Sequence, residues 1–326
     1  MTAVCIITSL SFLANPENYA NFLHTIGAIE IPVHSFVAFI ILFRTPRQMS
    51  SVKYPLFYLH FWTSLLDIHI SLLMSPLLLY PELASISLGL WEKIGLSAKV
   101  ETSLMIIFFA MVGTSLCGIY ENRYSVLASP LGVWKYNRYA LQFVNHVLSL
   151  AFVYPIISAV PEQKIAQELV WQRLPCPPPE PYHNKTFILA LDWRSSATYA
   201  VPFAVFIILQ IAIFLSMSIC ILRRALEEQK FSSSTLRMQR KFLFSVIIQT
   251  AIPFCVLLAP MVFNCYTIGW HVQMQGLTNV GFIFMTLHGL SSSLAILMIH
   301  RPYRDATFLI FQRNINIHTS VVSSTR

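Results

Sequence analysis

Apolar residues fill seven long runs of the chain, and shorter polar or basic segments separate these runs. A run of roughly 20 apolar residues, wound as a helix, is long enough to cross the ~30 Å hydrocarbon core of a bilayer. The pattern therefore predicts seven membrane-spanning helices. They cover residues 22–43, 56–80, 100–120, 139–160, 197–222, 242–265 and 275–299.

The second run carries a polar stripe along one face of its helix. His60, Ser64, Asp67 and Ser71 recur every three or four positions, so they lie on the same side. A charged side chain at the membrane midplane costs at least ~2.5–3.5 kcal/mol, so Asp67 must face other helices or water. His69 points about the opposite way and is expected to be an ordinary structural residue. The stripe predicts that this helix packs inside a bundle.

Composition places the chain among polytopic, all-α membrane proteins. Of its 326 residues, 56% are hydrophobic and only 11% are charged, against ~25% charged in soluble domains. The net charge of +8 is typical of basic cytoplasmic loops, so nucleic acid is not an expected partner. No basic region precedes the first apolar residues, and a cleavable signal peptide is not expected.

The distribution of basic residues predicts the orientation. With the N-terminus outside, 16 Lys and Arg residues fall in inner segments and 6 in outer segments, as the positive-inside rule requires. The predicted domains are an extracellular segment 1–21, a bundle 22–300 and a cytoplasmic tail 301–326 with a short interfacial helix. Asn184, in an Asn-Lys-Thr sequon, then lies outside as a glycosylation candidate.

The longest outer loop, residues 161–196, is expected to lie across the mouth of the bundle. Its proline-rich stretch 174–179 should be extended and stiff. Cys176 of this loop and Cys5 both lie outside, where disulfides form. The sequence favours a Cys5–Cys176 bridge and leaves Cys176–Cys265 open as the alternative.

Polar residues in other spans reach the depth of Asp67. His288 in the seventh span lies near the midplane, so we expect a network of Asp67, His288 and Ser292, joined by Ser64. Such a network is either part of a conformational switch or a purely structural contact, because buried polar contacts also hold membrane helices together.

Four residues are candidate ligand contacts from their predicted depth alone: Glu30, Glu101, Trp270 and Asn279. Glu101 and Trp270 could instead be anchors at the membrane interface. Glu30 lies four positions before His34, so both share a helix face. The sequence leaves open whether they pair with each other, with span 2 or with span 7.

The inner end of the third span reads Glu121-Asn122-Arg123-Tyr124, a candidate latch in a bundle that has two states. Arginine keeps its charge, so Arg123 either pairs with a carboxylate or reaches into an opening between helices. The alternative is simple anchoring by a basic residue. The third inner loop, residues 223–241, is either a docking surface or a solvated extension of two spans that touches anionic lipid. Its candidate coupling residues are Arg237, Arg240 and Lys241.

Short motifs along the whole chain resemble the nematode chemoreceptors called serpentine receptor class H. The resemblance implies a seven-helix chemosensory receptor in a sensory-neuron membrane that binds an external small molecule or peptide and signals through a heterotrimeric G protein. The matching motifs are Ile31-Pro32-Val33-His34, Phe43-Arg44-Thr45-Pro46, Ser51-Val52-Lys53, Leu59-His60-Phe61-Trp62, Asp67, Glu121-Asn122-Arg123-Tyr124, Leu174-Pro175-Cys176, Gln239-Arg240-Lys241-Phe242-Leu243, Ile252-Pro253, His288-Gly289-Leu290 and His300-Arg301-Pro302-Tyr303-Arg304.

The chain departs from rhodopsin-like receptors at two places. No cysteine lies at the outer end of the third span, and no Asn-Pro-x-x-Tyr ends the seventh, where residues 300–304 stand instead. Switch roles are therefore carried over only to Glu121, Arg123 and, by depth, Asp67.

Other function classes remain as alternatives to the receptor. A transporter or channel would use midplane acidic residues such as Asp67 and Glu30. A receptor-like scaffold that has lost signalling is a further alternative. Because no HExxH, GxSxG or phosphate-loop pattern occurs, neither an enzyme activity nor a cofactor is expected. No CxxC or Cys/His cluster has metal-site spacing, so no metal site is expected either.

Overall fold

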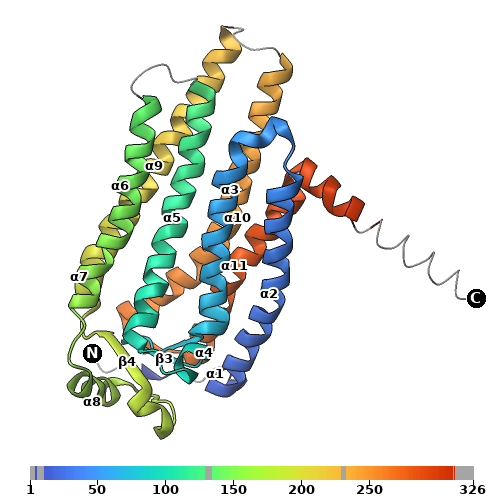
Figure 1. Ribbon diagram of the computed structural model, residues 1–326. Helices are drawn as coiled ribbons and strands as arrows, with labels where there is room; N and C mark the ends of the chain where they lie inside the picture. The colour runs from blue at the N-terminus through green and yellow to red at the C-terminus, as the bar shows by residue number, and fades with distance from the viewer. Residues whose placement is uncertain (1–3, 6–10, 129–133, 229–232, 311, 313–326) are drawn as a thin grey trace, which may run out of the picture.

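The computed structural model describes residues 4–5, 11–128, 134–228, 233–310 and 312. Long helices lie side by side along one axis, and short strands gather at one end of this bundle (Figure 1). We call this end the sheet end. We call the opposite end, where the helix that carries Arg123 finishes, the arginine end.

The seven predicted spans all correspond to helices, which confirms the all-α bundle. Six helices of the described chain are long and apolar enough to cross a membrane, and α10 contributes the apolar stretch Phe254–Trp270. The bundle helices are α2 (Pro16–Arg44), α3 (Ser50–Ile68), α5 (Ala98–Ala128), α6 (Trp134–Ala151) with α7 (Val153–Ser158), α9 (Trp193–Glu227), α10 (Ser233–Trp270) and α11 (Gln275–Ile299).

Local sequence explains where α2 begins and ends. The Asn15 side chain accepts hydrogen bonds from the backbone N–H groups of Glu17 (2.9 Å) and Asn18 (3.2 Å), and Pro16 occupies the first helical position. The helix stops at Thr45, which is extended because a proline follows it. The N-capping residue Asn15 lies before the apolar run, so the helix starts six residues before the predicted span.

The second span is shorter than its apolar run predicted. The α-helix ends at Ile68, a π-helical turn covers His69–Leu73, and Ser75 adopts a positive φ of 44°. Pro76 cannot donate a helical hydrogen bond and disfavours helix in the residue before it. Of the remaining apolar residues, 76–78 form a strand, and the run to position 80 is apolar because a protein cap buries it rather than lipid.

This cap is a three-stranded antiparallel sheet over the sheet end. It pairs β2 (Pro76–Leu78) with β3 (Leu83–Ser87), and β3 with β4 (Thr186–Ala190) from the long loop. Helix α8 (Gln163–Arg173) contributes Val170 to the same buried cluster as Leu77, Ile188 and Phe282 of α11. The loop expected to lie across the bundle mouth is thus a folded, packed cap.

A second strand pair ties the N-terminal segment to this cap. Strand β1 (Val4–Cys5) runs parallel to β5 (Val272–Gln273), with Cys5 beside Gln273. The Gln273 side chain accepts from the Cys176 N–H (2.9 Å) and donates to the Cys176 carbonyl (2.8 Å). Cys176 is disulfide-bonded and Cys265 is a free thiol, so the Cys176–Cys265 alternative is wrong. The side chain of Cys5 lies outside the described residues.

The third inner loop at the arginine end is largely an extension of its two flanking helices, which is one of the two alternatives that the sequence left open. Helices α9 and α10 extend across most of residues 223–241, of which 229–232 lie outside the described chain. The segment is therefore largely helical. The three candidate coupling residues stand exposed on the first turns of α10: Arg237, Arg240 and Lys241.

A helix over residues 301–310 follows α11 and leaves the bundle at an angle (Figure 1). Tyr303 is fully buried, and its hydroxyl lies 2.9 Å from the Thr45 hydroxyl, which holds this helix against the end of α2. Phe308 and Leu309 are 60% and 66% exposed, as expected of a helix that rests in the lipid interface.

Candidate functional site

Asp67 lies between two histidines at the centre of the bundle. Its Oδ2 atom is 3.2 Å from Nε2 of His34 on α2, and its Oδ1 atom is 3.0 Å from Nδ1 of His288 on α11. All three side chains are buried, with exposed fractions of 0–4%. One carboxylate on α3 therefore links three helices that are distant in sequence.

Further hydrogen bonds hold these groups in place. Nδ1 of His34 is 3.0 Å from the Ser293 hydroxyl of α11, and the Ser71 hydroxyl donates to Oε2 of Glu30 at 3.0 Å. We call Glu30, His34, Asp67 and His288 the central polar cluster. Its members contact residues of neighbouring helices, so the cluster joins α2, α3 and α11.

Hydrogen-bond partners assign two histidine tautomers. Nε2 of His60 faces the backbone carbonyl of His34 at 2.9 Å, so this nitrogen carries the proton. Nδ1 of His288 faces the Met285 carbonyl (2.8 Å) as well as Asp67, so it is also the donor. The remaining Nε2 of His288 is buried without a hydrogen-bond partner among the described residues.

The structure brings together part of the predicted network. Asp67 and His288 meet as expected. Ser64 joins only indirectly, since its hydroxyl donates to the His60 carbonyl at 2.7 Å. Ser292 lines a cavity beside His288. Sequence spacing did not identify His34 as the second partner of Asp67, because residues four apart share a face but do not reveal which helix they face.

Gly289 packs directly on the Asp67 carboxylate. A Cβ at Gly289 would collide with that carboxylate and lie 2.7 Å from the Thr63 methyl group, whereas a Cβ at Gly281 of the same helix would meet Pro260 at an ordinary 3.4 Å. We expect Gly289→Ala to lower the free energy of unfolding by ~1–3 kcal/mol through overpacking. Gly281→Ala, the matched control, should be neutral or stabilising by up to ~1 kcal/mol.

Thermal unfolding of the purified variants in detergent measures this difference. Equal melting temperatures for the two glycine variants would contradict the close packing of α11 against α3.

A cavity of about 120 Å³ adjoins the central polar cluster. His288, Ser292 and Thr63 line one side, and apolar side chains of α5 and α10 line the other. Side chains that border a void lack packing partners on that side. The contact of α10 with α3 and α5 is therefore looser here than in a filled core.

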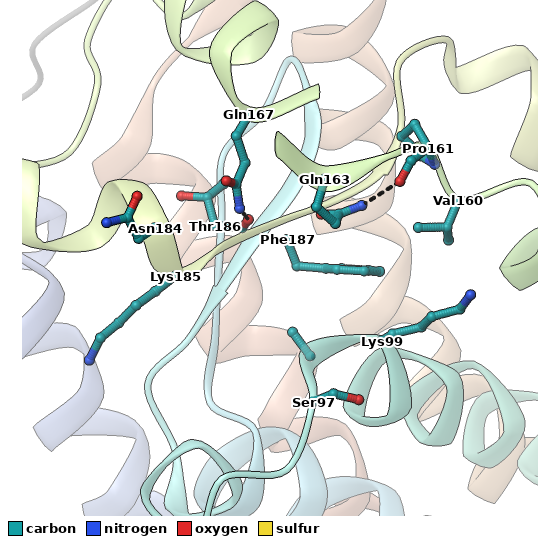
Figure 2. Close-up of a pocket in the computed structure, with 11 residues that line it drawn as sticks. Ser97, Lys99, Val160, Pro161, Gln163, Gln167, Asn184, Lys185, Thr186 and Phe187 are labelled. Carbon is teal, nitrogen blue, oxygen red and sulfur yellow. Dashed lines mark hydrogen bonds between the residues drawn. The ribbon is translucent and has the colours of Figure 1, made fainter. Parts of the chain in front are cut away.

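A second cavity, of about 370 Å³, opens at the sheet end (Figure 2). It lies between the cap and the start of α5, with Phe187 of β4 and Lys99 of α5 among its lining residues. The amides of Gln163 and Gln167 of α8 point at backbone carbonyls, those of Pro161 (3.0 Å) and Thr186 (2.5 Å), as Figure 2 shows. These amides hold the cap together.

The two lysines of this cavity differ in their surroundings. Lys185 donates to Oε1 of Glu92 at 2.8 Å, and this partner raises the lysine pKa. Lys99 is exposed, with its side chain on the opposite side of the cavity from Lys185 (Figure 2). Asn184, the sequon residue, is also exposed in the cavity lining.

None of the four candidate ligand contacts lines this cavity. Glu30 belongs to the central polar cluster, and Glu101 is fully buried with its carboxylate accepting from the Ser87 hydroxyl at 2.5 Å. Asn279 donates to the Leu13 carbonyl at 2.7 Å. Trp270 is 67% exposed at the end of α10, which agrees with the alternative that it anchors the membrane interface.

At the arginine end, Glu121 pairs with Arg138, a residue of another helix. Nη2 of Arg138 on α6 lies 3.1 Å from Oε2 of Glu121 and donates to Asn122 at 3.2 Å. Arg123 is itself buried, with 4% of its surface exposed, and Tyr124 beside it contacts the Trp134 ring. The sequence contained no spacing signal for Arg138, because α6 is a separate segment.

The pKa of His300, directly after α11, depends on the nearby charge of Arg123. Burial, and to a smaller extent the positive charge of Arg123, lowers the pKa of His300 from 6.5 to about 4. Below pH 6.5 the unfolded chain binds a proton here that the folded chain does not. The free energy of unfolding should therefore fall as the pH drops from 6.5 towards 4, and this contribution is constant above 6.5.

His300→Gln should remove part of this acid sensitivity. Unfolding of the wild type and of His300→Gln is measured at two pH values, one above 6.5 and one midway between 6.5 and 4. The other histidines are the same in the two proteins, so their contributions cancel when the two are compared at one pH. His271→Gln, at an exposed position, is the matched control. An unchanged pH dependence in His300→Gln would contradict the prediction.

Three comparisons relate this geometry to known proteins. A family model described as "Serpentine type 7TM GPCR chemoreceptor Srh" matches residues 14–313. Serpentine receptor class H-72 from Caenorhabditis elegans is 26% identical over 297 residues, which cover 90% of this chain and 85% of that protein. The crystal structure of squid rhodopsin has a TM-score of 0.61 at 12% identity, covering 91% of this chain and 85% of that chain. The rhodopsin likeness shows the fold alone.

Proposed function

Because the chain belongs to the Srh family of serpentine seven-transmembrane G-protein-coupled chemoreceptors, we propose that it binds an external chemical at the sheet end and activates a heterotrimeric G protein at the arginine end. It is a multi-pass membrane receptor and not an enzyme. The observation that carries the proposal is the central polar cluster, which couples α2, α3 and α11 between the two ends.

The orientation in this proposal rests on charge. Basic residues concentrate in the segments at the arginine end, so that end is assigned to the cytoplasm and the N-terminus to the outside. Residues 1–21 then form the extracellular segment, 22–300 the bundle and 301–326 the cytoplasmic tail. The sequon at Asn184 lies on the glycosylated side, and a sensory-neuron or ciliary membrane is the proposed location.

The cavity beneath the cap is the proposed ligand site. Its apolar surface around Phe187 and the exposed Lys99 amine suit a small molecule or short peptide that combines an apolar part with an acceptor or anionic group. Glu30, Glu101, Trp270 and Asn279 do not line this cavity, so the proposal no longer assigns them ligand contacts.

We propose that Cys5 is the disulfide partner of Cys176. Both flank the Gln273 strand position, and Cys176 is disulfide-bonded. The bridge would fasten the N-terminal segment to the ligand-side cap. Peptide mapping without reduction should find the two cysteine peptides linked, and a Cys176 peptide linked elsewhere would overturn the pairing.

Signalling requires two states of the bundle. A ligand changes the populations of the two states only if its affinity for one state exceeds its affinity for the other. An agonist under the cap must therefore bind more tightly to the state whose arginine end is open. The cavity beside His288 gives α10 room to move against α3 and α5. The buried Arg123, with Glu121 and Tyr124, and the exposed Arg237, Arg240 and Lys241 form the proposed G-protein surface.

A nucleotide-exchange assay tests this function. Membranes that contain the receptor, and matched membranes without it, are given a panel of small molecules and peptides together with mixed Gα subunits. We expect at least one compound to accelerate exchange only where the receptor is present. A compound that instead evokes an ion current dependent on Asp67, without exchange, would contradict the proposal and favour the channel or transporter.

A further inference from the structure

Three members of the central polar cluster have the arrangement of metal ligands. One ligand atom each from Glu30, His34 and Asp67 lies within 4.8 Å of the other two, and Nε2 of His34 and Oδ2 of Asp67 are 3.2 Å apart. Ligand atoms around a tetrahedral Zn²⁺, with bonds of ~2.0–2.2 Å, are ~3.4 Å apart. The Glu30 side chain has three rotatable bonds, so its carboxylate can adjust to a metal at this position.

The carboxylate of Glu30 gives a second, independent observation that points to a ligand. Its side chain is fully buried, and its Oε1 atom has no hydrogen-bond partner among the described residues. Two carboxylates, Glu30 and Asp67, thus lie close together with no solvent exposure. Like charges at this distance disfavour each other, and burial without compensation is expensive for each. A divalent cation between them would neutralise both.

We propose that Glu30, His34 and Asp67 bind one divalent transition-metal ion of the Zn²⁺ class, which joins α2 to α3 in the centre of the bundle. One imidazole and two carboxylates match the preferences of Zn²⁺ and its neighbours. Mg²⁺ and Ca²⁺ demand six or more oxygen ligands, and three protein ligand atoms, one of them nitrogen, do not supply these.

The surrounding contacts orient the proposed ligands. Binding through Nε2 of His34 requires the proton on Nδ1, where the Ser293 hydroxyl at 3.0 Å accepts it. Ser71 donates to one oxygen of Glu30 and leaves the other for the metal. His288 holds the second oxygen of Asp67 at 3.0 Å. Sequence spacing predicted no metal site because the ligands come from two helices and form no contiguous motif.

Metal binding to the purified receptor tests the proposal without ligand or G protein. The receptor in detergent is stripped with a chelator, incubated at length with Zn²⁺ or Co²⁺ because the ligands are buried, and freed of unbound metal by gel filtration. We expect one metal ion per chain by elemental analysis, the visible absorption of four-coordinate Co²⁺, and no retention of Mg²⁺ or Ca²⁺.

Variants separate this site from surface histidines. Glu30→Gln and His34→Gln should weaken binding more than ~10-fold, and Ser71→Ala, which keeps every ligand, by about 10-fold. Glu101→Gln and His69→Gln, at buried positions outside the cluster, are the matched controls and should bind like wild type. Each variant is first shown to be folded by its thermal transition.

Two results would overturn the proposal. One is a wild-type receptor that retains no stoichiometric metal, and this requires no variant to fold. The other is metal binding that Ser71→Ala and the ligand variants leave unchanged. Neither result bears on nucleotide exchange, so the receptor function is tested independently of the metal site.

Discussion

The Arg123→Ala receptor is expected to bind agonist but to lose agonist-driven nucleotide exchange. Arg123 is 4% exposed at the end of α5 and lies near His300, which follows α11. Its guanidinium keeps its charge even where it is poorly solvated, so separation of the helix ends would expose it to a partner. Alanine offers a G protein neither charge nor donors at this position.

Exchange and ligand binding are measured on the same membranes with wild type, Arg123→Ala and Arg301→Ala. Arg301 is the matched control because it lies at the same end but is 82% exposed, with its Nε atom 3.8 Å from the Asp305 carboxylate. Exposed pairs of this kind contribute about 0–1 kcal/mol, so Arg301→Ala should signal normally. Undiminished exchange by Arg123→Ala would remove Arg123 from the coupling mechanism.

The Asp67→Ala receptor is expected to lose ~3–5 kcal/mol of stability, the usual effect of breaking a buried charged pair. Its carboxylate is the common partner of His34 and His288, and both imidazoles would remain buried in the bundle. Asp67→Asn keeps the volume and one acceptor, so it should lose less. The difference between the two variants separates charge from packing.

Thermal unfolding in detergent, checked by ligand binding, measures this loss. Ser64→Ala is the matched control: the residue lies one helical turn away on the same stripe, and its hydroxyl donates to the His60 carbonyl of the same helix. Because this bond lies within α3 and joins no second helix, Ser64→Ala should change stability little. Equal effects of the Asp67 and Ser64 variants would reduce the cluster to ordinary interhelical contacts.

Local properties of the chain determined the architecture. The length of an apolar run and the 3.6-residue period do not depend on the rest of the molecule, so seven helices and the stripe through His60, Asp67 and Ser71 could be read directly. Depth along a span also follows from position, which is why Asp67 and His288 could be matched. The charge bias between alternate loops likewise needs only the sequence.

Contacts between distant segments required the tertiary structure. A helix's rotation about its own axis decides that His34 meets Asp67, and the packing of α6 on α5 decides that Glu121 meets Arg138. The strand at 76–78 looked like membrane span because burial under a protein cap and burial in lipid select the same apolar residues. Hydrophobicity reports that a side chain avoids water, and only the fold decides what covers it.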